Sequence, residues 1–319
     1  MPAVPYATAV HPVNVIDFSE SAWGLGLGTN LGAPPLMPIQ KFILKAYYGL
    51  PLDDGEYRIK ACAEPNGIEC ILTEKGFRDF AVKNGMLNTK ELNGKKSMVL
   101  VAGASGGKDT LASVIACYTA YSLLCVGSPQ DFYGVPSGDR MDITMAHANP
   151  EERLVVHNRV SGHVDRCQYL SRSLPGSSGG STVFPTTIGK DCRRGSVGIS
   201  FPTSADGYRG RNSFLLMLSC EGSERAVRDI WESAAPILAM WRNPDGGQAG
   251  RYVLTGRAVN GGLLYEEHKR SLSVDSGVLS FRLPTWIANP LVPGSYLASR
   301  MLDDHRYFST EFASEFEAG

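Results

Sequence analysis

The chain has 319 residues, enough for one large domain or two ordinary ones with a sizeable core. Lysine and arginine number 31 against 32 aspartate and glutamate, so the net charge of −1 excludes a globally basic nucleic-acid-binding protein. Any basic surface must be local, as at Arg193-Arg194 or at Arg209 and Arg211. No apolar run reaches membrane-spanning length, and the N-terminus lacks the basic-then-apolar order of a signal peptide. The seven cysteines have neither paired nor zinc-site spacing, which indicates free thiols in a reducing cytoplasm. Because no apolar run is long enough to span a membrane, no membrane partner is expected.

The N-terminal part of the chain predicts an arm followed by a helix. Residues 1–36 are rich in proline and glycine and contain an isolated aromatic residue, Trp23, so we expect an arm packed on a larger body. Residues 37–50 place apolar side chains at helical spacing, and Pro38 suits the first turn of a helix. Residues 55–96 favour short strands and a small amphipathic helix near residues 75–84.

The next segment has the order of a phosphate-binding loop. Residues 98–102 form an apolar strand, residues 103–107 a glycine-rich turn, and a helix begins at Lys108. In that order the backbone N–H groups of the turn face an anion, and the lysine reaches the β- and γ-phosphates of a nucleotide. Two positions depart from the usual pattern, since Ala102 replaces the first glycine and Asp109 replaces the Ser or Thr that binds Mg²⁺.

Beyond this loop, strands alternate with helices. Such alternation predicts an α/β fold with a mainly parallel sheet, whose ligands bind at the carboxyl ends of the strands. The apolar run 214–218 is bounded by polar residues and is expected to be a central strand. The other predicted elements are the helix 108–124, a strand at 142–146, a helix at 151–164, a loop or two-stranded excursion at 171–196, a strand at 197–201, a helix at 223–242 and a strand at 251–255.

An acidic residue just after the central strand is the second part of the predicted nucleotide site. Glu221 is the candidate for orienting the attacking water. The aspartate that normally precedes it is replaced by Cys220, and a thiol is a poor ligand for the hard Mg²⁺ ion. One hypothesis is that Asp109 supplies the metal-binding charge missing at Cys220. The opposing hypothesis is a decayed site, because an extra anion beside the polyphosphate repels it.

A second glycine- and serine-rich stretch, residues 175–181, is similar to the nucleophile turn of chymotrypsin-like proteases. Protease chemistry would need a histidine and an aspartate held in a two-barrel β fold. His147 and His157 lie in segments that predict an α/β fold, so a polar loop is the preferred interpretation.

Several segments together resemble the ATPase domain of the large terminase subunit, the DNA-packaging motor of tailed bacteriophages. The resemblance implies a RecA-like P-loop NTPase fold, with a mainly parallel central sheet flanked by helices and a small lid or linker subdomain. The similar segments are residues 18–25 with 38–45, the loop at 99–111, the strand and helix at 146–164, the turn at 204–210, residues 254–256, and the tail at 283–290 and 308–316.

The resemblance also implies roles for single residues, with ATP and Mg²⁺ as cofactors. Gln40 would read the adenine base, Arg209 would act as an arginine finger or phosphate sensor, and Thr255 would couple hydrolysis to movement. The predicted cofactor-binding residues are Gln40, Gly103, Ser105, Gly106, Gly107, Lys108, Asp109 and Thr110; the catalytic residues are Lys108, Glu221 and Arg209; and the metal ligands are Asp109 and Glu221.

The implied organisation is an N-terminal arm (1–36), an ATPase core (37–262) and a C-terminal lid or linker region (263–319). The family's nuclease domain would begin about where this chain ends, so no nuclease activity is expected. The implied partners are double-stranded DNA, the portal protein, the small terminase subunit and further copies of the chain in a ring, in the host cytoplasm. The expected function is an ATPase that drives DNA into a capsid. The alternative is a catalytically degenerate relative with a structural or regulatory role.

Overall fold

The computed structural model describes residues 12–30, 32–60, 69–136, 139–172, 176–178, 181–188, 193–209, 211–273 and 276–316. The chain divides into two compact units, each built from segments distant in sequence. Unit 1 holds Met1–Pro35, Ala112–Met217 and Asp229–Tyr252, and unit 2 holds Leu36–Leu111, Leu218–Arg228 and Val253–Gly319. Within the described ranges, no helix has both the length and the apolar composition needed to cross a membrane.

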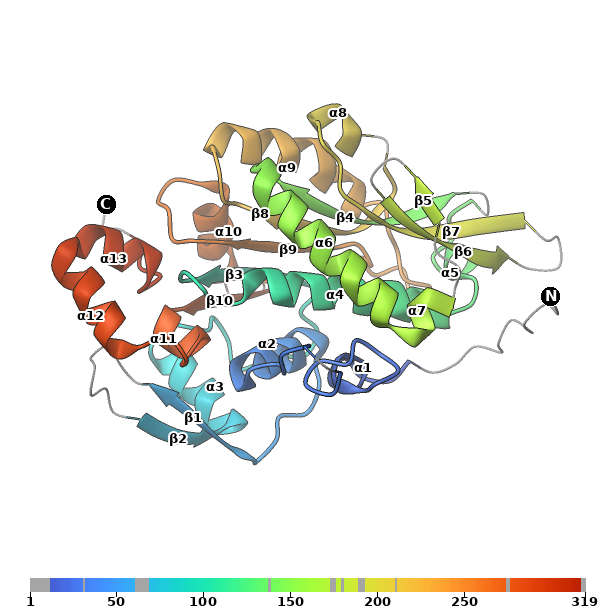
Figure 1. The fold of residues 1–319 in the computed structure, drawn as a ribbon. Helices are drawn as coiled ribbons and strands as arrows, with labels where there is room; N and C mark the ends of the chain where they lie inside the picture. Colours follow the sequence, from blue (N-terminus) through green and yellow to red (C-terminus); the bar gives the residue numbers. More distant parts are fainter. Residues whose placement is uncertain are drawn as a thin grey trace. The chain divides into compact units, whose positions relative to one another are not determined.

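Unit 2 contains a parallel sheet that supports the predicted phosphate loop (Figure 1). β3 (Ser97–Ala102) lies between β10 (Val278–Leu283) and β9 (Arg251–Gly256), and both neighbours run parallel to it. The end of β8 (Ser213–Ser219) lies next to β9. Every residue of β3 and of β8 is buried, which explains why these segments are continuously apolar instead of alternating. α10 (Leu263–Ser271) packs on β3 and β10.

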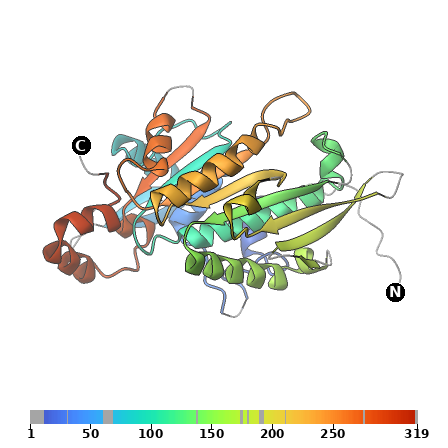
Figure 2. The same cartoon turned by 90° about the horizontal axis from the view of Figure 1, so that it is seen from above.

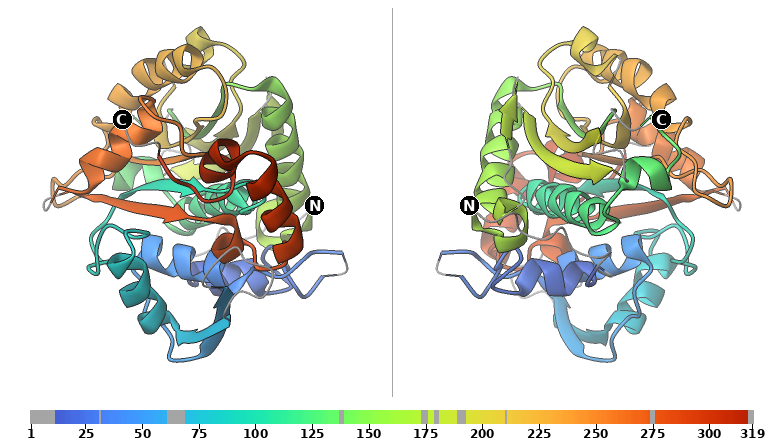
Figure 3. Two further views of the ribbon diagram at one scale, coloured as in Figure 1. Left: turned by 90° about the vertical axis from the view of Figure 1, so that its left-hand side faces the viewer. Right: turned by 90° about the vertical axis from the view of Figure 1, so that its right-hand side faces the viewer.

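The N-terminal part of unit 2 is a helix with a small hairpin subdomain, drawn in blue to cyan in Figure 3. β1 (Glu56–Lys60) and β2 (Glu69–Thr73) pair antiparallel, and α3 (Glu74–Lys83) follows β2 directly. The helix predicted at 37–50 is α2 (Pro38–Tyr48), which ends at Gly49 in the left-handed conformation that glycine adopts without strain. The predicted strands and amphipathic helix of residues 55–96 are therefore confirmed.

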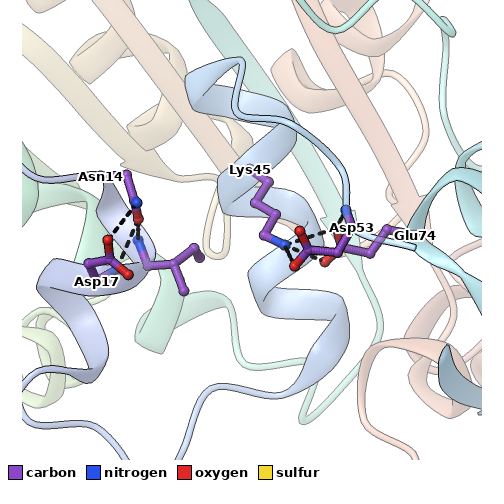
Figure 4. Close-up of polar contacts among 6 residues, drawn as sticks. Asn14, Asp17, Lys45, Asp53 and Glu74 are labelled. Carbon is purple, nitrogen blue, oxygen red and sulfur yellow. Dashed lines mark hydrogen bonds and ion pairs between the residues drawn. The ribbon is translucent and has the colours of Figure 1, made fainter. Parts of the chain in front are cut away.

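A buried ion cluster joins α2 to this subdomain (Figure 4). The Lys45 ammonium donates to both carboxylate oxygens of Glu74 at 2.9 Å and lies 2.5 Å from Asp53 Oδ2. The side chains of Lys45 and Glu74 are only 10% and 9% exposed. Burial opposes the charged amine, but the hydrogen bonds to Asp53 and Glu74 outweigh it and hold the pKa of Lys45 above its usual value.

Three short helices end the described chain in unit 2. α11 (Thr285–Ala288) packs on α2 and β1, while α12 (Gly294–Asp303) and α13 (His305–Glu311) lie side by side (Figure 2). Leu297, Phe308 and Phe312 form their common apolar cluster, and Ala104 of the predicted phosphate loop packs against it. The C-terminal helices are thus anchored on the loop.

Unit 1 carries the other strands in the order β8, β4 (Arg140–His147), β7 (Arg193–Ser200), β6 (Ser181–Ile188) and β5 (Gly176–Ser178). β4 and β7 are parallel, whereas β7, β6 and β5 pair antiparallel, so the predicted excursion at 171–196 is confirmed as antiparallel strands. The predicted α/β fold with a mostly parallel sheet flanked by helices is confirmed. The remaining helices are α1 (Val15–Glu20), α4 (Lys108–Cys125), α5 (Pro129–Phe132), α6 (Pro150–Arg166), α7 (Gln168–Arg172), α8 (Ala205–Tyr208) and α9 (Glu224–Leu238).

The prediction of a helix over 223–242 was too long, because α9 ends at Leu238. Pro236 lies in its last turn and has no N–H to donate to the preceding turn. The chain then reverses, with the N–H of Ala249 donating to the carbonyl of Trp241 at 2.9 Å. Trp241, just beyond the end of the helix, is 2% exposed and packs on Phe214 with ring centroids 5.6 Å apart.

Replacing Lys45 tests the buried ion cluster. Lys45→Met is expected to lower the free energy of unfolding by about 3 kcal/mol, because the Glu74 carboxylate is left buried without a cation. Lys75→Met is the matched control, since Lys75 pairs with Asp54 at an exposed position, and its effect is expected to stay below about 1 kcal/mol. Urea unfolding measures both, and equal effects would contradict the account.

Candidate nucleotide-binding site

The turn between β3 and α4 has the backbone of an anion-binding loop. Ser105 and Gly107 have φ values of 60° and 76°, in the left-handed region, while the N–H of Gly106 donates to the carbonyl of Gly103 at 3.1 Å. Left-handed residues within a tight turn bring successive N–H groups toward one side, which is how backbone concavities bind phosphate. The predicted loop residues therefore form one continuous turn into the first turn of α4.

Two glycines of this turn are required by close contacts. A Cβ atom on Gly103 would lie 2.3 Å from Thr285 Oγ1, and one on Gly107 would lie 2.3 Å from Gln40 Nε2. Gln40 is 4% exposed, and its Oε1 accepts the N–H of Met37 at 2.9 Å at the start of α2. The structure thus brings Gln40, predicted to read adenine, against the phosphate loop.

Lys108 and Glu221 meet at the carboxyl end of the sheet. The Lys108 ammonium lies 3.0 Å from Glu221 Oε1 and donates to the carbonyl of Ala102 at 3.0 Å. The two side chains are 13% and 17% exposed. β3 and β8 are separated by β9 in the sheet, so two distant predicted residues come together only through the fold.

A second cation lies near the same oxygen of this carboxylate. Arg257 follows β9, and its Nε lies 3.8 Å from Glu221 Oε1. The guanidinium also forms a short ion pair with Glu311, the last residue of α13. Four charged side chains of unit 2 therefore form a row: Lys108, Glu221, Arg257 and Glu311.

The C-terminal segment holds the loop from outside. The N–H of Ala104 donates to the carbonyl of Glu311 at 2.6 Å, and Thr285 Oγ1 donates to the carbonyl of Ala104 at 2.9 Å. Asn289 Nδ2 donates to the carbonyl of Ser105 at 3.1 Å. These hydrogen bonds fix the turn that positions Lys108, so the segment after β10 is part of the site.

Cys220 and Thr255 tie the ends of β8 and β9 together. The N–H of Cys220 donates to the carbonyl of Thr255 at 2.7 Å, and Thr255 is 8% exposed. Burial raises the pKa of the Cys220 thiol, and the carboxylates of Glu224, Glu221 and Glu267 raise it further. A thiol is, by its chemistry, a poor ligand for the hard Mg²⁺ ion.

The residues predicted as metal ligands fit Mg²⁺ only in combination with a nucleotide. Within the described part of the chain, no three His, Cys, Asp or Glu side chains gather as a metal centre. Mg²⁺ at nucleotide sites is typically held by one or two carboxylates together with phosphate oxygens and water. Asp109 is exposed in the first turn of α4, next to Thr110, and Glu221 lies at the end of β8. Their role as ligands stays a prediction.

Arg209 lies in unit 1, whereas the loop, Lys108 and Glu221 lie in unit 2. It is exposed and directly follows α8, whose N-terminus is capped by Ser204 Oγ accepting the N–H of Gly207 at 3.2 Å. Gly210, the next residue of the predicted turn, lies outside the described residues. The role of Arg209 as an arginine finger stays a prediction.

Sequence reasoning missed the second half of the charged row. Arg257 directly follows residues 254–256, the segment predicted to couple hydrolysis to movement, so its position in the sequence could have indicated a functional role. Glu311 lies 54 residues further along the chain, and no motif links the two residues. Only the fold of the C-terminal helices brings Glu311 to Arg257.

Comparison with known families identifies the fold. The family model described as "Uncharacterized protein MJ0330, N-terminal P-loop domain" matches residues 8–172, just over half of the chain. The chain belongs to this P-loop family. The match includes the loop at 103–107 and the helix that begins at Lys108. A comparison with curated protein sequences finds no match.

Solved structures with a similar fold include phage large terminases. The HK97 bacteriophage large terminase aligns with a TM-score of 0.53 and 13% identity over 95% of this chain and 55% of its own length. This chain thus spans about half of that protein. The Thermus phage P74-26 large terminase ATPase domain gives a TM-score of 0.46 and 18% identity, over 74% of this chain and 93% of its own. A mutant of that domain gives a TM-score of 0.49 and 15% identity, over 70% of this chain and 90% of its own length. The predicted resemblance to large terminase ATPase domains is confirmed at the level of the fold.

Substitution of Gly107 tests the contact between the loop and Gln40. Gly94→Ala is the control, because Gly94 has a φ of 78° and open space around its Cα, so only backbone strain of about 1 kcal/mol is expected. Gly107→Ala adds displacement of Gln40 to the same strain, and we expect a loss of about 2 kcal/mol or more. Equal losses in chemical unfolding would contradict the packing of Gln40 on the loop.

Proposed function

We propose that the chain is an ATP hydrolase of a viral DNA-packaging motor, coupling hydrolysis to the movement of double-stranded DNA into a capsid. The observation that carries the proposal is the ion pair between Lys108 and Glu221, at 3.0 Å, directly beside a phosphate-loop turn. A lysine at this position is the group that holds β- and γ-phosphates, and an acid at the end of a neighbouring strand orients water. The two charges neutralise each other until a polyphosphate competes for the lysine.

In the proposed reaction each residue has one task. The turn and the N-terminus of α4 supply backbone N–H donors, Lys108 holds the β- and γ-phosphates, and Gln40 contacts the base. Glu221 accepts a hydrogen bond from the attacking water and orients it toward the γ-phosphorus. Mg²⁺, when bound, would neutralise charge on the phosphates, and Asp109 and Glu221 are the carboxylates that would hold it.

The packaging part of the proposal is supported by the similarity of the fold to that of the HK97 bacteriophage large terminase. The partners that follow are double-stranded DNA, a portal protein, a small terminase subunit and further copies of this chain in a ring, in the host cytoplasm. Arg209 would then stabilise the transition state in a neighbouring copy of the chain. Thr255, whose carbonyl accepts the N–H of Cys220 directly before Glu221, would couple hydrolysis to movement.

A second candidate, a catalytically degenerate relative with a structural role, rests on one observation. Directly after β8, Cys220 stands where a carboxylate is usual, and a thiol is a poor ligand for the hard Mg²⁺ ion. Asp109 lies exposed in the first turn of α4 and would have to supply the charge of that carboxylate.

Substitutions at the ion pair test ATP hydrolysis. Lys108→Ala is expected to weaken MgATP binding at least tenfold, because a charged hydrogen bond to phosphate is lost. Glu221→Gln is expected to retain binding and to lower kcat by about a hundredfold or more, because the water loses its orienting base. Isothermal titration and steady-state phosphate release measure the two effects.

Lys90→Ala, an exposed lysine of unit 2, is the control and should behave as the parent. Double-stranded DNA is expected to raise the turnover of the parent and to leave Glu221→Gln inactive. A parent that binds no MgATP would contradict the proposal, and one that binds MgATP without turnover would favour the degenerate candidate.

Exchange at Asp109 distinguishes the two candidates. If Asp109 supplies the metal-binding charge, Asp109→Ser lowers turnover about tenfold at limiting Mg²⁺, because a hydroxyl is the weaker ligand without an acid at position 220. The double variant Asp109→Ser with Cys220→Asp restores the usual order and is expected to recover activity. An Asp109→Ser variant as active as the parent would exclude compensation.

A further inference from the structure

Beyond Lys108 and Glu221, the row of charged side chains continues with Arg257 and Glu311. The Glu221 carboxylate faces two cations, Lys108 at 3.0 Å and Arg257 at 3.8 Å. Arg257 is in turn paired with Glu311, whose side chain is 13% exposed. A partly buried carboxylate with two cationic neighbours remains compensated when one of them leaves.

The proposed function requires one of them to leave. A polyphosphate draws Lys108 toward its β- and γ-oxygens, and the ammonium can no longer hold Glu221 as it does at 3.0 Å. The carboxylate would then stand next to the negative charge of the nucleotide. Without a remaining cation, repulsion by the phosphates would turn it away from the water that it must orient.

We propose that Arg257 is a positioning residue for ATP hydrolysis: held by Glu311, it keeps Glu221 oriented after Lys108 has moved to the phosphates. This inference rests on the proposed function and deepens it. Arg257 is attached to the end of β9, and Glu311 to the end of α13, so neither depends on the nucleotide for its place.

The chemistry that this arrangement serves is a single displacement. The oxygen of water forms a bond to the γ-phosphorus as the bond to the β–γ bridging oxygen breaks, which gives ADP and inorganic phosphate. The proton of the water passes to Glu221 and from there to the phosphate product. Arg257 stays an ion-pair partner throughout and exchanges no proton.

One of the hydrogen bonds that hold the loop is made by Glu311. The backbone carbonyl of Glu311 accepts the N–H of Ala104, while its side chain pairs with Arg257. One residue of α13 thus contacts the phosphate loop through its main chain and the hydrolytic acid through Arg257. The C-terminal helices therefore set the relative position of the two halves of the site in unit 2.

The test compares Arg257→Gln, Arg257→Lys and Glu311→Gln with the parent in steady-state ATP hydrolysis. Arg257→Gln is expected to lower kcat at least thirtyfold while KM and the MgATP dissociation constant stay within threefold, because Lys108 and the loop are intact. Arg257→Lys is expected to keep a higher kcat than Arg257→Gln, because it retains the positive charge. Glu311→Gln is expected to lower kcat less than Arg257→Gln does. The double variant Arg257→Gln with Glu311→Gln is no slower than Arg257→Gln alone, because Glu311 acts through Arg257.

Arg300→Gln is the matched control, since Arg300 lies on α12 and pairs with Asp303 on the surface. It is expected to leave kcat unchanged. If Arg257→Gln has the kcat of the parent, or loses MgATP affinity in parallel with kcat, the role assigned to Arg257 is wrong, while the proposed hydrolysis still stands. A parent chain without turnover would overturn both this assignment and the proposed hydrolysis, so the two failures are distinguishable.

Discussion

The structure of the site depends on one electrostatic constraint, the pairing of Lys108 with Glu221. Both side chains are mostly buried at the carboxyl ends of strands that are continuously apolar, and neither charge is stable there alone. Their mutual attraction keeps the lysine close to the loop and the acid close to the place where a γ-phosphate would lie. In the proposed function a polyphosphate would offer the lysine a stronger partner. One contact would then serve both the packing of the two side chains and the proposed binding of phosphate.

The segment after β10 holds the residues around this ion pair in place. Thr285, Asn289 and the carbonyl of Glu311 hold the outside of the turn, and the Glu311 side chain holds Arg257. A glycine-rich turn alone is conformationally permissive, so the rigidity of the loop must come from such contacts. The region expected to be a lid or linker therefore contributes directly to the site. A change in α13 has a short physical route to the loop and to the acid.

Much of this arrangement was predictable from the sequence. The buried strand before the turn, the run 214–218 and the lysine that opens α4 are local patterns, and the fold placed them as expected. The resemblance to large terminases implied that Gln40 reads adenine, which stays a prediction, whereas its place beside Gly107 was not predicted. Arg257 and Glu311 were not predictable, because their pairing depends on how helices 54 residues downstream pack. The prediction ran past the end of α9 at Leu238, although Pro236 lies in its last turn.

The central claim is that Lys108 exchanges Glu221 for a phosphate. A crystal structure of the chain with Mg²⁺ and a non-hydrolysable ATP analogue tests it most directly. The account predicts the Lys108 ammonium within hydrogen-bonding distance of a β- or γ-phosphate oxygen and further than 3.0 Å from Glu221 Oε1. An analogue bound elsewhere, with the ion pair intact, would contradict it, as would a loop that stays empty at saturating analogue.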